Sequence, residues 1–209
     1  MSTTVLETLT LPEQLMAFIH AGNGRPYESV EPAKVTAAAE LAELVLQGYV
    51  RLEDDQLVAD QPAMGRRPWM TTAVSELVGQ PRPVRDWIRE RRDALARQQQ
   101  LGIEHGVLTF DRGRFLGFGY DKHEVVPEAR QALMSALLAP SAAADPRLAS
   151  LAQLMVKSNL HVRGGITRHE RERLQEVAEA AADLPVPRLV VTAMHAAVGY
   201  AIYSTITSD

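Results

Sequence analysis

The chain has 209 residues, 46% of them hydrophobic, a formal net charge of −4 at pH 7 and no cysteine. A chain of this length buries a hydrophobic core without covalent staples, and the lack of cysteine excludes disulfides and thiolate metal sites. The negative net charge disfavours a protein that binds nucleic acid over its whole surface. We expect a single domain over 1–209, with 1–9 as a flexible N-terminal segment.

The ends of the chain carry no predicted membrane signal. The first residues have neither a basic stretch nor a long apolar core, so we expect no signal peptide. The most apolar run, 189–203, is shorter than a membrane span requires and contains His195 and Gly199. These features predict a cytoplasmic protein, either soluble or peripheral on the inner face of a membrane.

The first quarter of the chain predicts two helices followed by a hairpin. Thr10 is a typical N-cap for a helix over 12–20. Apolar residues recur at helical spacing over about 33–47 and predict a second helix. Two short alternating runs flank a pair of aspartates in 49–60, which predicts a β-hairpin.

A long helix is predicted over about 83–104, after a shorter one over 70–78. The long helix carries Arg85, Arg89 and Arg92 at i, i+4 and i+7, beside an apolar stripe. These three side chains would form a basic edge along an apolar face.

A second hairpin is predicted over 106–118, with Asp111-Arg112-Gly113 as its tight turn. The run from Phe115 to Phe118 does not alternate. From periodicity alone, it is either a buried strand or an exposed edge for a membrane or another subunit. Phe115, Leu116 and Phe118 are therefore candidate residues of a membrane-binding or self-association hairpin.

From residue 127 onward the sequence predicts only helices. Their expected ranges, separated by proline and glycine breaks, are 127–139, 146–160, 167–182 and 188–205. The predicted fold class is mainly α, as a single-domain helical bundle wrapped by amphipathic helices, with two short β-hairpins in the first half.

No catalytic or cofactor motif is present. The glycines of 117–120 are too few for a dinucleotide loop, and neither a P-loop nor H-E-x-x-H nor a G-x-S-x-G elbow occurs. We expect no enzyme activity, no cofactor and no metal site. The helix and hairpin of 33–59 resemble a winged helix, but an acidic wing would repel phosphate, so nucleic acid is a disfavoured partner.

The segment 66–97 contains eight arginines and four acids. Guanidinium groups offer fork-shaped donors that suit phosphate oxygens. We therefore take Arg85, Arg89, Arg92 and Arg97 as candidate residues for binding anionic headgroups. The equally supported alternative is a solvated face that its neighbouring acids, Asp86, Glu90 and Asp93, partly neutralise.

Four segments in the same order resemble the Golgi phosphoprotein family. They are "ELVLQGYVRLED" (43–54), "QPRPVRDWI" (80–88), "GIEHGVLTFDRGRFLGF" (102–118) and "ADPRLASLAQLMVKSNL" (144–160). The resemblance covers about 10–205. It implies a helical bundle wrapped by amphipathic helices, with an apolar hairpin projecting from a flat basic face. The eukaryotic relatives are peripheral Golgi proteins that recognise phosphatidylinositol 4-phosphate and bind cytosolic tails of glycosyltransferases. Bacterial relatives exist, and the arginine- and alanine-rich composition suits a bacterial source.

The family's headgroup pocket carries over only in part. The positions that match its tryptophan and first arginine are Glu28 and Ala37, and those that match its two helical arginines are Arg92 and Leu95. One of the four residues is therefore retained. The resemblance implies affinity for anionic phospholipids, without phosphatidylinositol 4-phosphate specificity.

The leading hypothesis is a non-enzymatic peripheral adaptor on anionic membranes, using the basic helix and the apolar hairpin. The alternative is a cytosolic regulator that binds protein or nucleic acid through the same face, and a third is an enzyme without a recognisable motif. A protein partner or self-association remains open.

Overall fold

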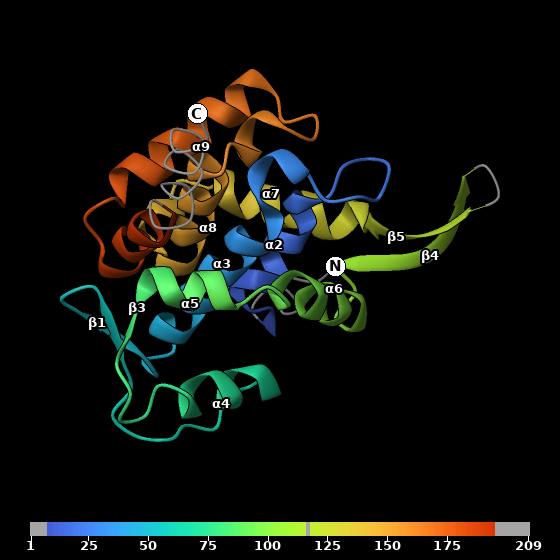
Figure 1. Ribbon diagram of the computed structural model, residues 1–209. Coiled ribbons are helices and arrows are strands. Elements are labelled where there is room, and N and C mark those ends of the chain that lie inside the picture. Colours follow the sequence, from blue (N-terminus) through green and yellow to red (C-terminus); the bar gives the residue numbers. More distant parts are fainter. Residues whose placement is uncertain (1–7, 116–117, 195–209) are drawn as a thin grey trace, which may run out of the picture.

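The structure, a computed structural model, describes residues 8–115 and 118–194 (Figure 1). It is mainly helical, which confirms the predicted fold class. The longer helices are α2 (Leu11–Ile19), α3 (Pro32–Leu46), α4 (Pro68–Ser75), α5 (Val84–Glu90), α6 (Ala94–Glu104), α7 (Pro127–Leu138), α8 (Pro146–Lys157) and α9 (Arg168–Ala180). Residues 185–194 are also helical. The strands are β1 (Arg51–Glu53), β2 (Gln56–Val58), β3 (Arg82–Pro83), β4 (Leu108–Phe115) and β5 (Phe118–Val125).

Helix α2 lies at the centre of the hydrophobic core. Each of its nine residues is buried, and it packs against α3, α6, α7 and α8. Apart from Glu13 and Gln14 the helix is apolar, which favours a position surrounded by other helices. The predicted N-cap is confirmed: Thr10 and Glu13 form a capping box, and the Thr10 N–H donates to Glu13 Oε2 at 3.0 Å.

The first predicted hairpin is confirmed and gains a third strand. β1 and β2 pair antiparallel around Asp54 and Asp55, which both have positive φ, at +46° and +66°. Asp tolerates this conformation better than most residues, which explains its place in the turn. The short strand β3 then pairs with β2 and brings the start of α5 beside this sheet.

The predicted long helix over 83–104 is wrong, because it is two helices. α5 ends at Glu90 and α6 begins at Ala94, with a turn between them. The break is at Arg91, whose ψ of +48° leaves the helical region. Its guanidinium carbon lies 3.9 Å from the ring centroid of Trp87, and its Nη2 pairs with Glu76. These contacts hold Arg91 in a conformation that helical periodicity does not reveal.

The predicted turn at Asp111-Arg112-Gly113 is also wrong, since these residues lie inside strand β4. The hairpin is longer than expected: the β4–β5 register runs from Leu108 opposite Val125 to Phe115 opposite Phe118. Asp111 lies opposite Lys122 and Arg112 opposite Asp121. Opposite charges facing each other across two strands stabilise the ladder and outweigh a local turn preference. In Figure 1 the hairpin projects from the helical body as an arm.

Candidate functional site

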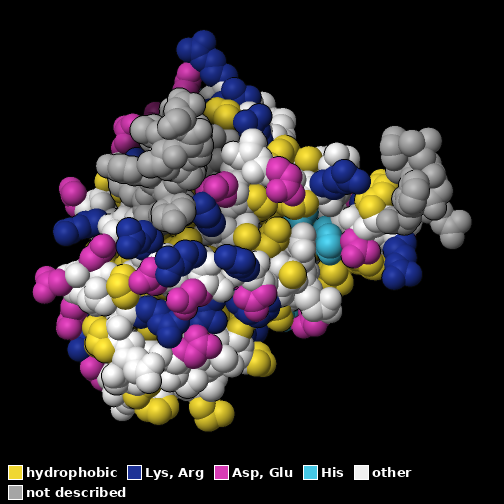
Figure 2. Space-filling model, in the orientation of Figure 1, with side chains coloured by type: hydrophobic (Ala, Val, Ile, Leu, Met, Phe, Trp, Pro, Cys, Tyr) yellow, Lys and Arg dark blue, Asp and Glu magenta, His cyan; other side chains and the backbone are white. Residues whose placement is uncertain are grey.

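The outer side of α5 carries two of the predicted headgroup-binding arginines. Val84, Trp87 and Ile88 are buried against the core, so Arg85 and Arg89 point outward and are exposed. Arg89 Nη2 lies 3.0 Å from Asp86 Oδ1. Figure 2 shows basic side chains gathered over α5, with acidic ones interspersed among them.

Arg92 lies in the turn between α5 and α6 and is exposed. Within residues 8–115 and 118–194, neither Arg85 nor Arg92 takes part in an ion pair. Arg85, Arg89 and Arg92 therefore come from one short stretch of surface, and two of the three have no acidic partner there.

Arg97, the fourth predicted residue, has a different environment. Its guanidinium reaches inward from α6 to the buried carboxylate of Glu40 on α3, with Nε 3.1 Å from Oε1 and Nη2 3.0 Å from Oε2. Gln98 Nε2 donates to the same carboxylate at 2.6 Å. Arg97 is therefore joined to the core and is not part of the outward-facing group.

Burial governs the ionisation of Glu40. Removal from water raises its pKa, and the contacts from Arg97 and Gln98 oppose this effect without cancelling it. The exposed Asp93 also pairs with Arg97, so this arginine contacts two acids. Its donors are thus largely used inside the protein.

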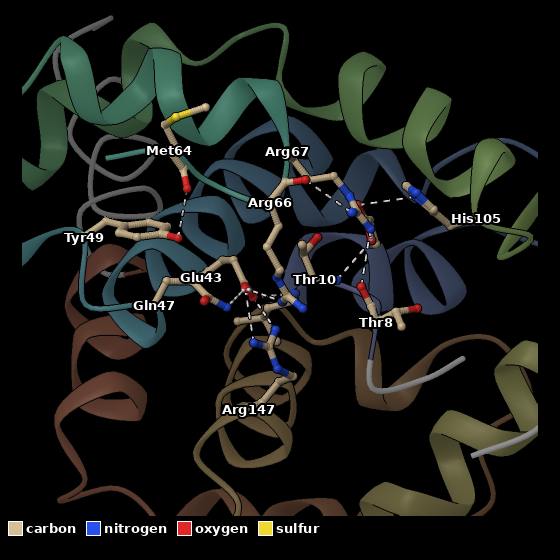
Figure 3. A network of polar contacts seen from close by, with 12 residues as sticks. Thr8, Thr10, Glu43, Gln47, Tyr49, Met64, Arg66, Arg67, His105 and Arg147 are labelled. Carbon is tan, nitrogen blue, oxygen red and sulfur yellow. Dashed lines mark hydrogen bonds and ion pairs between the residues drawn. The ribbon is translucent and has the colours of Figure 1, made fainter. Parts of the chain in front are cut away.

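A second buried carboxylate, that of Glu43, lies one turn further along α3 (Figure 3). Arg147 of α8 forms a forked contact with it, with Nη2 3.1 Å from Oε1. The N–H of Leu11 donates to Oε2 at 2.8 Å, and Gln47 Nε2 donates to Oε1 at 2.7 Å. Arg66, from the loop before α4, lies 3.4 Å from Oε1. Burial alone would raise the pKa of Glu43, but the bonds and charge of Arg147, helped by the other donors, lower it.

Glu13 of α2 is the third buried carboxylate. Arg67, the N-cap of α4, meets it with Nε 2.7 Å from Oε1 and Nη2 3.1 Å from Oε2. His105 Nδ1, at the end of α6, lies 3.5 Å from Oε1. Figure 3 shows this group beside the Glu43 group, so the ion pairs join α2, α3, α4, α6 and α8. We name Glu13, Glu40 and Glu43 with their arginines the buried ion-pair set.

Sequence reasoning missed the buried ion-pair set. One signal was available: Glu40 and Glu43 interrupt the apolar run "AAAELAELVL", where a charge on the inward face requires a partner. The partners themselves carried no signal, because Arg147 lies 104 residues from Glu43 and Arg97 lies 57 residues from Glu40.

Two of the predicted hairpin residues, Phe115 and Phe118, belong to the projecting arm. Phe115 and Phe118 form the last backbone pair of β4 and β5. Leu116 and the side chains of the two phenylalanines lie outside the described residues. Phe110, nearer the body on β4, is 48% exposed. Across the described ranges, there is no group of three or more His, Asp or Glu side chains placed to hold a metal ion, and no helix has the length and apolarity to cross a bilayer.

These features define a mainly helical protein with exposed arginines on α5 and the turn after it, a set of buried ion pairs and a projecting two-stranded arm. A comparison with protein families matches residues 11–197 to the family described as Golgi phosphoprotein 3 (GPP34). The chain therefore belongs to the Golgi phosphoprotein 3 family, as its four sequence segments indicated. A search of curated proteins found no match.

Proposed function

We propose that the chain is a non-enzymatic peripheral membrane adaptor that binds anionic phospholipid headgroups through Arg85, Arg89 and Arg92. The observation that carries this proposal is the exposure of all three side chains on one short stretch, two of them without an acidic partner in the described chain. Each arginine near an anionic leaflet contributes about 1 kcal/mol, so three support reversible binding. Arg97 is not part of the proposed headgroup site, because its guanidinium pairs with the buried carboxylate of Glu40.

The β4–β5 arm would supply a second, apolar contact. Its backbone register brings Phe115 opposite Phe118 at the far end, and Phe110, five positions earlier on β4, is 48% exposed. Shallow insertion of aromatic side chains adds to electrostatic attraction at a membrane surface. The same arm would also suit self-association, in which case binding would depend on protein concentration.

The membrane proposed here is one of general negative charge. Of the four positions that match the family's headgroup pocket, only Arg92 keeps a basic residue, while Glu28, Ala37 and Leu95 do not. A surface cluster of arginines recognises charge density more than the shape of one headgroup. We expect binding at the cytoplasmic face, without preference for phosphatidylinositol 4-phosphate over other lipids of equal charge.

Co-sedimentation with vesicles tests the proposal. The wild type should bind vesicles of phosphatidylcholine with phosphatidylserine, bind phosphatidylcholine alone much less, and lose binding as salt rises. The triple variant R85Q/R89Q/R92Q should lose most of this binding. Its matched control is R163Q/R168Q/R188Q, which removes the same charge from exposed arginines elsewhere. Equal binding by the two variants would contradict the proposed face. Binding that neither rises with the phosphatidylserine content nor falls with salt would contradict the proposal.

A further inference from the structure

A hollow of about 940 Å³ lies at the foot of the β4–β5 arm, away from the arginines of α5. It opens between the turn after α2, the start of α7 and the loop before α9, which lie near one another in Figure 1. Its polar lining includes Tyr27, Thr109 and Arg130, and its apolar lining includes Val125 and Pro127. A smaller hollow of about 420 Å³ continues along α7. The two share Arg130, and the second adds the apolar side chains Met134, Leu138 and Ile166.

Arg130 is fixed between the two hollows by neutral groups. Its Nη1 donates to the carbonyl oxygen of Ala17 at 3.4 Å, and its Nη2 donates to that of Gly164 at 2.7 Å. Its guanidinium carbon lies 5.5 Å from the ring centroid of Phe18. Gly164 permits this approach, since a Cβ there would lie 2.5 Å from Nη2 and the residue has a φ of +63°. The carbonyls orient the guanidinium but do not neutralise its charge.

The carboxylates that line the hollows are engaged elsewhere. Glu124 pairs with Lys122. Glu170 accepts from the N–H of Thr167 at 2.7 Å and from its hydroxyl at 2.8 Å. These bonds lower the pKa of Glu170, and the charge of Arg130 contributes less. Among the residues that the structure describes, no carboxylate lies within ion-pair distance of Arg130. By contrast, Arg67, Arg97 and Arg147, which are also partly buried, each meet a buried glutamate.

We infer that the hollow is a binding site for an oxyanion, a carboxylate or a phosphate, carried on an apolar body. The oxyanion would meet the N–H groups of Arg130 that the two carbonyls leave unused, because a guanidinium offers five donors in a planar fork. The apolar body would lie on Val125 and Pro127 in the larger hollow. A pocket that combines apolar walls with a few oriented polar or charged groups is typical of small-molecule sites. The site is separate from the headgroup surface proposed above and does not depend on it.

Calorimetric titration of the full chain with hexyl phosphate tests the inference. We expect saturable binding that R130Q weakens at least about tenfold, the loss typical of a charge-assisted contact. R163Q is the matched control, because Arg163 adjoins the same loop but is exposed and lines neither hollow. It should bind as the wild type does. Absence of saturable binding, or equal weakening by R163Q, would overturn the inference.

A second variant separates binding from folding. Ala21 lines the larger hollow, so Ala21→Phe should narrow it while leaving Arg130 in place. We expect Ala21→Phe to bind hexyl phosphate more weakly than the wild type with little change in the thermal unfolding midpoint, and unchanged affinity would contradict the site. Parallel titrations identify the source of the ligand. Binding of hexyl phosphate and hexanoate points to soluble metabolites, whereas binding of dihexanoyl phosphatidic acid at much lower concentration points to a lipid. Equal binding of inorganic phosphate would contradict the role given to the apolar walls.

Discussion

Arginine serves opposite purposes in two regions of this protein. Arg67, Arg97 and Arg147 point inward and meet buried glutamates, whereas Arg85, Arg89 and Arg92 point outward from α5 and the turn after it. Arg97 and Arg92 are only five positions apart in the sequence. A buried carboxylate as partner makes an arginine structural, whereas an arginine without one is available to a ligand. The density of arginines along the chain does not separate the two kinds.

The largest loss of stability is expected when the buried carboxylate that pairs with an inward-pointing arginine is removed. Glu43→Ala removes the carboxylate that Arg147 meets and leaves a partly buried cation without a partner. We expect a loss of about 3–5 kcal/mol in the free energy of unfolding, measured by urea denaturation at neutral pH. Glu172→Gln, which breaks an exposed pair with Arg168, should change it by less than about 1 kcal/mol. Similar losses in both variants would contradict the distinction.

The buried His20 makes the stability of the protein depend on pH. Burial lowers the pKa of His20 from 6.5 to about 4. Because the folded state binds the proton less tightly than the unfolded state, the stabilising effect is complete above pH 6.5 and is lost as the pH falls toward 4. The difference corresponds to about 3 kcal/mol. Between pH 7 and pH 4, His20→Gln should therefore lose less stability than the wild type, by up to this amount. An unchanged pH slope for His20→Gln would refute the prediction.

Arg97 tests the distinction most directly, because it points inward although it is close in sequence to the outward-pointing arginines. Arg97→Gln leaves the carboxylate of Glu40 buried with weaker donors. We expect a loss of about 2 kcal/mol in the free energy of unfolding, since unsatisfied buried charges are costly. Vesicle binding per folded molecule should stay close to that of the wild type. A strong loss of vesicle binding in a folded Arg97→Gln protein would place this residue in the outward-facing group.

The smallest effect on stability is expected at the surface. R85Q/R89Q/R92Q removes side chains that share one exposed ion pair, Arg89 with Asp86. The free energy of unfolding, measured with urea, should change by no more than about 1 kcal/mol, because each exposed substitution contributes little. A clearly larger loss would show that these arginines support the fold.

The sequence predicted what local chemistry determines. The N-cap at Thr10 depends only on the residues that begin its own helix, and it is confirmed. The hairpin at Asp54 and Asp55 is equally local. The family itself was recognisable from four short segments, which the match over residues 11–197 confirms.

Tertiary contacts decided the rest. The break after α5 depends on Arg91 meeting Glu76, and the length of the β4–β5 arm depends on the pairing of two strands along their whole length. No periodicity reports such contacts. The sequence also does not predict the hollow around Arg130, since Ala17, Gly164 and Arg130 come from three segments far apart in the chain. That the chain forms one domain, and that its exposed arginines bind lipid, stay predictions.

The ion pairs around Glu13 and Glu43 have a consequence for how the protein unfolds. Each joins segments far apart in the chain: 104 residues separate Arg147 from Glu43, and 54 separate Arg67 from Glu13. If α8 or α4 alone detached, a carboxylate would remain in the core without its cation, at a high cost in free energy. Local opening of these helices is thereby disfavoured relative to global unfolding. Amide hydrogen exchange in α2, α3 and α8 should therefore occur with one shared free energy, as expected of a single cooperative unit.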